Sequence, residues 1–268
     1  MTREDWLIQI INAALRGGEE ILEVYNSVPT GVGIAVEYKD DKSPLTEADK
    51  RAHIAIVNAL KETELPILSE EGKKMDYSER KNWKQFWMVD PLDGTKEFIK
   101  RNGEFTVNIA LIEGGKATMG VIYVPVTKDL YFADKLAYKI EGFDKPTVSI
   151  NNLLGRADQL PLSQTRTNYV VVGSRSHMSE ETEAFINAQK EKHSEVDILS
   201  KGSSLKLCMV AEGAADAYPR FAPTMEWDTA AGQAIANASG AKVINWDTKE
   251  LMEYNKENLL NSWFLVER

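Results

Sequence analysis

WMVDPLDGT, residues 87–95, is the stretch of sequence from which the rest of the chain is best understood. The apolar run from Phe86 to Val89 predicts a short buried strand that ends at an acid. Pro91 disfavours the α conformation at Asp90, so the chain should leave this strand extended. Asp90 and Asp93 then lie on a tight turn, where both carboxylates and the Leu92 carbonyl can converge on one point. Such a set of oxygens suits Mg²⁺.

The residues that follow the two acids have both a functional and a structural interpretation. Gly94 would let a ligand approach the backbone closely. Thr95 precedes Lys96-Glu97-Phe98-Ile99, which predicts a helix start whose unpaired N–H groups could hold a phosphate. An Asx-type turn between strand and helix would use the same residues without any ligand. The turn alone therefore does not decide between a site and a structural element.

The first part of the chain predicts two helices against an antiparallel sheet. Helical spacing of apolar residues predicts helices over 4–26 and 46–61, the second with Thr46 as N-cap. Its packed face is expected to hold Ala48, Ala52, Ile56 and Ala59. Short apolar runs or alternation predict strands at 67–68, 86–89, 105–111, 119–123 and 130–132, with a hairpin turn at 113–116. The alternation at 105–111 is typical of a half-buried strand.

After about residue 139 the pattern changes to alternating strands and helices, as in α/β layers. Strands are predicted at 170–172, 243–244 and 263–266, and helices at 179–192, 203–212 and 228–238. Gly240 is the expected C-terminal stop of the last helix. We therefore predict two parts, 1–138 and 139–268, which pack tightly because no Pro-, Gly- or Ser-rich linker separates them.

Composition excludes several classes of protein. The 268 residues are 43% apolar and hold 41 acids against 32 Lys and Arg, a net charge of -9, which argues against binding to polymeric nucleic acid. A single cysteine, Cys208, excludes an intrachain disulfide framework, fits a reducing cytoplasm and is expected in the core. With three histidines and one cysteine, any metal should be hard and oxygen-bound rather than zinc.

No segment of the sequence predicts membrane insertion. No window approaches ~18 uncharged apolar residues, so no transmembrane helix is expected. The opening MTREDWLIQI carries acids and is not expected to be a signal peptide. We expect a cytoplasmic protein. Peripheral association with the inner face of the inner membrane stays open, although no basic amphipathic helix indicates it.

Four more acids lie next to apolar segments or at the start of predicted helices. Glu70 and Glu71 end the run that starts at Ile67, and Asp228 follows Trp227 at the start of the alanine-rich helix. Asp49 lies in the first turn of the second predicted helix. Each has a structural alternative, as a solvated turn, an N-cap or a partner of the helix dipole.

Taken together, these segments make the chain resemble the lithium-sensitive, Mg²⁺-dependent phosphatase superfamily that includes inositol monophosphatase. Four blocks carry the likeness in the family's order: SPLTEAD at 43–49, SEE at 69–71, DPLDGT at 90–95 and WDTAAG at 227–232. Within that superfamily the chain is most similar to bacterial 3'(2'),5'-bisphosphate nucleotidases of the CysQ type. That narrower likeness rests on KEFI at 96–99, GSRSH at 173–177, GSSLK at 202–206 and YPRF at 218–221.

The resemblance implies a fold and a metal site. The fold would be the α+β or α/β layered α-β-α-β-α sandwich of the inositol monophosphatase and fructose-1,6-bisphosphatase type. Two or three Mg²⁺ ions would bind, the first to Glu70, Asp90 and the Leu92 carbonyl, the second to Asp90, Asp93 and Asp228. Gly94 and Thr95 would contact the scissile phosphate. Asp49 and Thr95, with Glu70, would form the catalytic set that positions and deprotonates the attacking water.

The resemblance also implies where a nucleotide would bind. A second phosphate or the ribose and adenine would meet Arg175, Lys206 and Arg220, because cationic forks match phosphate oxygens. Ser203 and Ser204 open a predicted helix and add donors, and His177 would stack on or hydrogen-bond the nucleotide. Residues that also border the substrate are Glu70, Leu92, Asp93, Gly94, Thr95 and Asp228. Each cation alone is more often a solvated surface group.

The leading hypothesis is therefore Mg²⁺-dependent removal of the 3'-phosphate from adenosine 3',5'-bisphosphate (PAP), giving AMP. The sulfated nucleotide 3'-phosphoadenosine 5'-phosphosulfate (PAPS) is a further candidate, and the role would be to support sulfate assimilation. The alternatives are an inositol or sugar monophosphate phosphatase with the same metals, and a nucleotide-binding regulator without catalysis. The sequence leaves open the oligomeric state, the number of ions acting at once and the order of preference among these phosphates.

Overall fold

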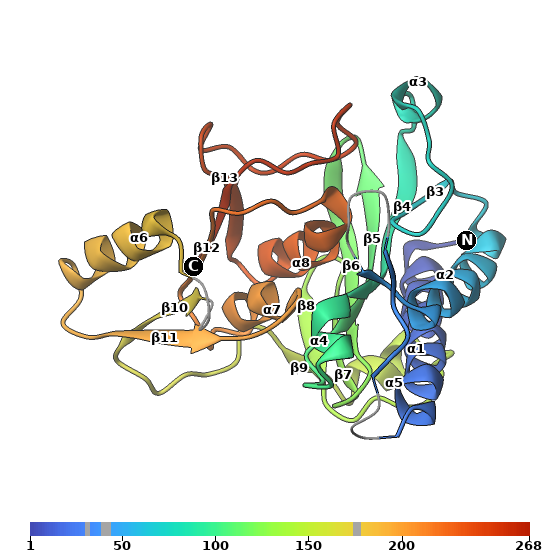
Figure 1. Cartoon of the computed structure of the whole chain (residues 1–268), viewed down its shortest axis with the longest axis horizontal. Helices are drawn as coiled ribbons and strands as arrows, with labels where there is room; N and C mark the ends of the chain where they lie inside the picture. The colour runs from blue at the N-terminus through green and yellow to red at the C-terminus, as the bar shows by residue number, and fades with distance from the viewer. Residues whose placement is uncertain (30–32, 39–43, 174–177) are drawn as a thin grey trace.

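Two β-sheets alternate with three helical layers in the computed structural model, which describes residues 1–29, 33–38, 44–173 and 178–268 (Figure 1). Helices α1 (Arg3–Ser27) and α2 (Glu47–Leu60) cover the outer face of a seven-stranded sheet. Helices α7 (Leu205–Ala211) and α8 (Glu226–Ala238) lie between this sheet and a five-stranded one. Helix α6 (Glu180–Lys190) packs on the far side. The expected α-β-α-β-α sandwich is confirmed.

The first helical layer forms as its sequence pattern predicts. A capping box begins α1, in which the Thr2 amide donates to Asp5 Oδ2 at 2.7 Å and the Asp5 amide donates to Thr2 Oγ1 at 3.1 Å. The expected face of α2, from Ala48 to Ala59, is buried. Both predicted helices are confirmed to within one residue at each end.

The seven-stranded sheet carries one half of the site. Its order is β3-β4-β5-β6-β7-β8-β9, and only the β3–β4 pairing is parallel. The strands are β3 (Ile67–Ser69), β4 (Gln85–Asp93), β5 (Thr106–Glu113), β6 (Lys116–Val124), β7 (Asp129–Ala133), β8 (Ala137–Ile140) and β9 (Asp158–Gln159).

The expectation of a half-buried strand at 105–111 is wrong, because β5 is buried on both faces. Val107, Ile109 and Leu111 pack in the cluster formed with α1 and α2. The alternate residues Ala110 and Ile112 belong to a second core that α8 completes. Alternation in this strand therefore separates two cores rather than core from solvent.

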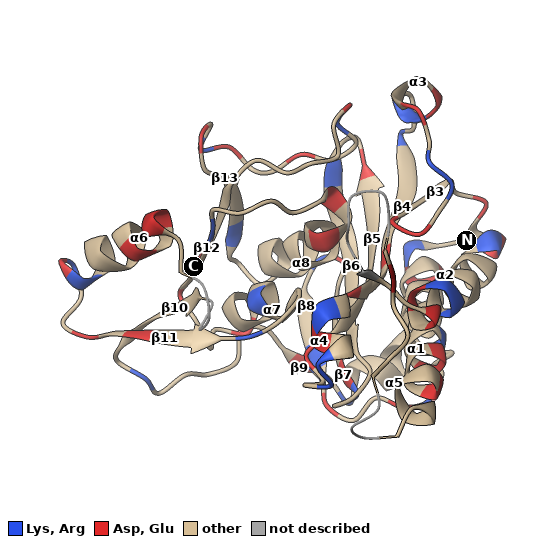
Figure 2. Ribbon diagram, in the orientation of Figure 1, with Lys and Arg blue, Asp and Glu red and all other residues tan. Residues whose placement is uncertain are grey.

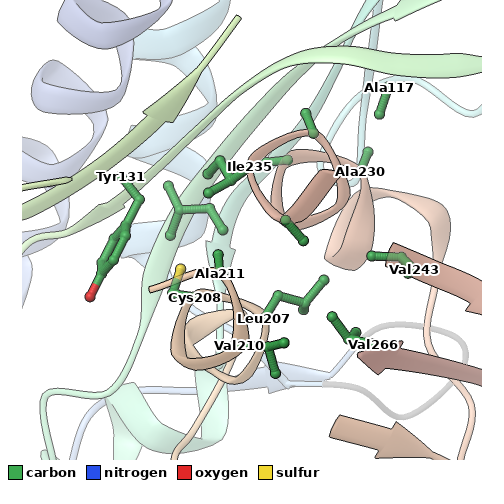
Figure 3. Close-up of a cluster of buried hydrophobic side chains, with 14 of the residues drawn as sticks. Ala117, Tyr131, Leu207, Cys208, Val210, Ala211, Ala230, Ile235, Val243 and Val266 are labelled. Atoms are coloured by element: carbon green, nitrogen blue, oxygen red, sulfur yellow. The ribbon is translucent and has the colours of Figure 1, made fainter. Parts of the chain in front are cut away.

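Helix α8 lies unusually close to the sheet. A Cβ atom on Gly120 of β6 would lie 2.6 Å from the Ala231 carbonyl oxygen of α8, so a side chain there would push the helix away. On its other side α8 meets α7, and Figure 3 shows Ala230 and Ile235 near Leu207, with Val243 and Val266 of the second sheet nearby. Cys208 is 1% exposed within this core, which confirms its expected place.

The five-stranded sheet has the order β11-β10-β12-β14-β13. It consists of β10 (Tyr169–Gly173), β11 (Val196–Ser200), β12 (Ala217–Arg220), β13 (Lys242–Asn245) and β14 (Phe264–Glu267), with β10 parallel to β11 and β12. The predicted strands and helices of this half are confirmed, although α8 begins two residues earlier than predicted, at Glu226. Strands β11 and β12 were not predicted.

Short elements complete the chain. They are β1 (Glu37–Tyr38), β2 (Pro44–Leu45), the 3₁₀ turn Lys61–Thr63, α3 (Tyr77–Arg80), α4 (Thr95–Ile99) and α5 (Ile150–Leu154). The predicted boundary between the parts 1–138 and 139–268 falls inside strand β8. The division of the chain into these two parts stays a prediction. None of the helices in the described parts of the chain combines the length and the apolarity needed to cross a membrane.

Candidate metal and phosphate site

Strand β4 brings its two acids to one edge of the sheet through a bulge. Strand β4 continues through Pro91 to Asp93 rather than ending before them, and the Asx-type hydrogen bond weighed from the sequence is present within it, from the Leu92 amide to Asp90 Oδ1 at 3.0 Å. Asp90 pairs with Asn108 of β5 and Asp93 pairs with Thr106, and the register shifts between these two pairs. Proline cannot donate to a sheet ladder, so it is tolerated where a bulge interrupts the pairing.

Three acids from separate elements converge at this edge. Glu70, Asp90 and Asp228 each offer a carboxylate oxygen, and these oxygens lie within 4.8 Å of one another. The Glu70 amide donates to the Val89 carbonyl at 3.0 Å, which extends the β3–β4 pairing and fixes the loop that carries Glu70. Asp228 is the third residue of α8, where its Oδ2 accepts the Met225 amide at 2.8 Å.

The electrostatics of this cluster favour a cation. Burial raises the pKa of Asp90 well above its usual range, and the neighbouring Glu70, Asp93 and Asp228 raise it further. Burial and then Asp93 raise the pKa of Asp228 to about 8. Like charges held this close are costly unless a counter-charge is present. The donors are all oxygens, so the residues fit a hard divalent ion such as Mg²⁺.

Asp93, also expected to bind metal, lies beside the cluster and contacts the start of α7. Its Oδ2 accepts hydrogen bonds from Ser203 Oγ at 2.9 Å, the Ser204 amide at 2.6 Å and Ser204 Oγ at 2.6 Å. It remains close enough to contribute to the raised pKa of both Asp90 and Asp228. The predicted metal residues are thus brought together by the fold, with Asp93 attached to two serines.

Asp49 and Thr95 also meet, although they lie 46 residues apart. Thr95 Oγ1 donates to Asp49 Oδ1 at 3.3 Å and lies 3.5 Å from the Leu92 carbonyl oxygen. The other oxygen, Asp49 Oδ2, accepts the Thr46 amide at 2.7 Å and the Thr46 hydroxyl at 2.6 Å. Gly94 has φ 94°, a left-handed conformation that favours glycine and turns the chain into α4.

A cavity of about 730 Å³ begins at these acids and extends toward the second sheet. Seven of the candidate site residues named from the sequence line it: Asp93, Gly94, Ser203, Ser204, Lys206, Arg220 and Asp228. Gly173 lines it too, and Arg175 and His177 follow two and four residues later but lie outside the described residues. The cavity therefore reaches from Asp93 and Asp228, at the edge of the acidic cluster, to basic residues on its opposite wall.

Two half-buried cationic side chains, Lys206 and Arg220, line the cavity away from the acids. Lys206 Nζ donates to the Ser203 carbonyl at 2.7 Å and lies 5.8 Å from the centre of the Tyr218 ring. Burial lowers the pKa of Lys206. Arg220, at the end of β12, donates to the Pro223 carbonyl at 3.2 Å, while its buried Nε has no hydrogen-bond partner among the described residues.

Three other basic residues line the cavity, Lys96, Lys100 and Lys201. From the sequence, Lys96 is part of the KEFI block only and Lys100 is interpreted as a solvated charge, so neither is assigned to the site, and Lys201 is missed. Lys96 lies on α4, and Lys100 follows four residues later as the C-cap of that helix. Figure 2 shows blue segments of Lys and Arg at α4 and at its end. That spacing is visible in the sequence and could have indicated a basic helix face directly after the two acids.

Comparison with known proteins decides the family. The model of the inositol monophosphatase family matches residues 3–267. The chain belongs to the inositol monophosphatase family. Metal ions are a general requirement of this family, which agrees with the acidic cluster at the β3–β4 edge.

Individual relatives confirm the narrower resemblance. The 3'(2'),5'-bisphosphate nucleotidase CysQ of Salmonella typhimurium is 44% identical, with 97% of this chain and 98% of the relative covered. The crystal structure of CysQ from Bacteroides thetaiotaomicron is 52% identical, covers 98% of this chain and 97% of its own, and superposes with a TM-score of 0.89. An inositol monophosphatase from Thermotoga maritima, 22% identical with a TM-score of 0.67, shares the fold.

Proposed function

We propose that the chain is a Mg²⁺-dependent 3'(2'),5'-bisphosphate nucleotidase that removes the 3'-phosphate of PAP, leaving AMP and phosphate. One observation carries the proposal: the cavity that reaches Lys206 and Arg220 is also lined by Asp93 and Asp228, and Asp228 belongs to the carboxylate cluster with Glu70 and Asp90. A substrate with two phosphates has one group for each end. The CysQ relatives, named as bisphosphate nucleotidases, support the same substrate class.

Five oxygen donors would hold two or three Mg²⁺ ions at the acidic end. Glu70, Asp90 and the Leu92 carbonyl are assigned to a first ion, and Asp90, Asp93 and Asp228 to a second. When bound, the ions supply positive charge that stabilises the negative charge on the phosphate oxygens. The protein contributes a rigid frame, because its ligands come from β4, from the buried helix α8 and from the residue after β3, whose amide is bonded to the Val89 carbonyl of β4.

Asp49 and Thr95 would hold and deprotonate the attacking water. The Thr95 hydroxyl already donates to Asp49 Oδ1, so its oxygen is available to accept a hydrogen bond from water. As the water attacks, its proton passes to Thr95 Oγ1 and the threonine proton passes to Asp49. Two hydrogen bonds from Thr46 hold the other Asp49 oxygen, which keeps the receiving oxygen in place. Glu70 completes the catalytic set through the first ion.

The basic end would select the substrate. Lys206 and Arg220 are placed to bind the second phosphate, and the Arg220 Nε is a buried donor without a partner in the described structure. Ser203 adds a hydroxyl at the cavity wall. Arg175 and His177, which follow the cavity residue Gly173, are assigned to the ribose and adenine.

The proposal extends to PAPS, which carries the same 3'-phosphate and would give adenosine 5'-phosphosulfate (APS). The enzyme would then support sulfate assimilation by removing these nucleotides. Support for this extension is chemical: the reacting group is identical, and only the group at the basic end differs. Relative rates on PAP and PAPS measure it directly.

Phosphate release from a panel of substrates tests the function. We expect PAP to be hydrolysed fastest, 3'-AMP more slowly because it lacks the second phosphate, and inositol 1-phosphate slowest. All activity should disappear with EDTA and return with Mg²⁺. Faster turnover of inositol 1-phosphate than of PAP would instead support the monophosphatase alternative. Nucleotide binding without any turnover would support a regulator, although the complete set of carboxylates speaks against that role.

A further inference from the structure

Asn108 is a buried amide beside the acidic cluster to which the proposed function gives no role. It is 1% exposed and lies in β5, an interior strand of the sheet, directly opposite Asp90 in the β4–β5 register. Its side chain does not pack among apolar neighbours of its own strand. It reaches 96 residues along the sequence, to Ser204 at the start of α7.

The amide belongs to a chain of hydrogen bonds that ends at the metal site. Thr106 Oγ1 donates to Asn108 Oδ1 at 3.0 Å, and Asn108 Nδ2 donates to Ser204 Oγ at 2.8 Å. Ser204 Oγ lies 2.6 Å from Asp93 Oδ2 and 2.8 Å from the Asp228 carbonyl oxygen. Both acceptors belong to residues assigned to the second ion.

Proton counting gives Asn108 a specific effect. A serine hydroxyl has one proton to donate. Because Asn108 donates to the Ser204 oxygen, that proton must point away from the amide, toward Asp93 or the Asp228 carbonyl. Thr106 in turn fixes which end of the amide faces Ser204. All three contacts from Ser203 and Ser204 reach Oδ2 of Asp93, which leaves Oδ1 for a cation.

We propose that Asn108 is a positioning residue of the metal site, which orients the Ser204 hydroxyl and so holds the Asp93 carboxylate ready for the second ion. The inference rests on the metal site of the proposed function. Partners that hydrogen-bond a metal ligand orient it, and their loss costs about 10–100-fold in metal affinity or activity. A purely structural role would lower thermal stability and leave metal affinity unchanged.

The test compares two substitutions in β5 of the full-length protein. Asn108→Leu keeps the side-chain size and removes the donor. Ile109→Ala is the control, because Ile109 is 0% exposed and packs on the opposite face, in the core with α1 and α2. Mn²⁺ binding to the substrate-free protein is measured by titration calorimetry, and melting by circular dichroism. We expect both variants to melt at a lower temperature. Only Asn108→Leu should lose affinity for Mn²⁺, by about 10–100-fold at the more weakly bound of the two ions.

A double-mutant cycle separates action through Ser204 from a direct effect. In a Ser204→Ala background, Asn108→Leu should cause little further loss of Mn²⁺ affinity, because the hydroxyl that it orients is gone. High Mg²⁺ should restore the turnover of Asn108→Leu toward that of Ile109→Ala. Ser204→Ala alone carries the test if Asn108→Leu does not fold, because it removes the same hydrogen bond to Asp93.

The outcomes distinguish this inference from the proposed function. If the wild type binds Mn²⁺ and hydrolyses PAP but Asn108→Leu binds Mn²⁺ equally well, the role of Asn108 is overturned and the function stands. Fully additive losses in the double mutant would also overturn it. If the wild type binds no divalent ion, the metal site of the proposed function is wrong, and the positioning role falls with it.

Discussion

The two ends of the cavity are built differently. At the acidic end, Asp90 is 1% exposed and its neighbours come from strand ends and from the long helix α8, so the carboxylates are held by the core itself. At the basic end, Lys206 and Arg220 donate to backbone carbonyls. Lys96 of the short helix α4 and Lys100 at its C-cap are exposed. The difference suggests a division of labour, in which the rigid end performs the reaction and the more adaptable end selects the substrate.

Removal of an acid should produce the largest effect on turnover. Asp90→Asn takes away a ligand assigned to both ions, and we expect kcat to fall by about 10³-fold, equivalent to about 4 kcal/mol. The fold should survive, because the change also removes a crowded buried charge. Circular dichroism and phosphate release measure both. Glu71→Gln, at an acid outside the cluster of three, is the matched control and should keep most activity.

Loss of the Thr95 hydroxyl should have the next largest effect. Thr95→Val keeps the shape but removes the group that joins water to Asp49, and we expect kcat to fall by about 10²-fold. Thr95→Ser restores the hydroxyl and should recover most of the rate. Mn²⁺ affinity should stay the same in both variants. A large loss of Mn²⁺ affinity in Thr95→Val would place Thr95 in metal binding instead.

Substitutions at the basic end of the cavity should change substrate binding, measured as KM, rather than the rate of the chemical step. Lys206→Ala and Arg220→Ala each remove a charge-assisted contact, and we expect the KM for PAP to rise about 10-fold with little change in kcat. The KM for 3'-AMP should barely change, because this substrate lacks the second phosphate. Lys116→Ala, at an exposed turn far along the sheet, is the control. If the KM values for PAP and 3'-AMP rose equally, the basic end would not bind the second phosphate, and the proposed difference between the two ends of the cavity would be wrong.

The smallest expected effect is a change with pH in the free energy of unfolding, measured in EDTA so that no metal is bound. The folded-state pKa values of Asp90 and Asp228 are raised, the latter to about 8, so the folded protein binds these protons more tightly than the unfolded chain. The stabilisation is complete below the ordinary Asp pKa of 3.8 and is lost as pH rises through the raised values. Urea unfolding at pH 5, 7 and 9 should show this decline, and Mg²⁺ should flatten it. Lys206, whose pKa is lowered by burial, should contribute no similar decline.

The sequence predicted the elements whose causes are local. Periodicity gave α1 and α2, and apolar runs ending in acids gave the strands that carry Glu70 and Asp90. The pairing of Asp49 with Thr95 came from the resemblance, since 46 residues separate them.

The remainder depends on contacts between distant segments. The burial of both faces of β5 depends on α8, more than a hundred residues later. The bulge at Pro91 depends on the register with β5, and the role of Asn108 depends on α7. No local pattern around these residues contains that information.

Gly120 shows how far the demands of the active site extend into the molecule. The helix that carries Asp228 rests against this glycine, and a single added carbon would meet the Ala231 carbonyl at 2.6 Å. Any larger residue would shift α8 and displace a carboxylate that the glycine itself never approaches. In a library randomised over β6 and selected only for growth on enzyme activity, position 120 should therefore tolerate as little variation as the acids.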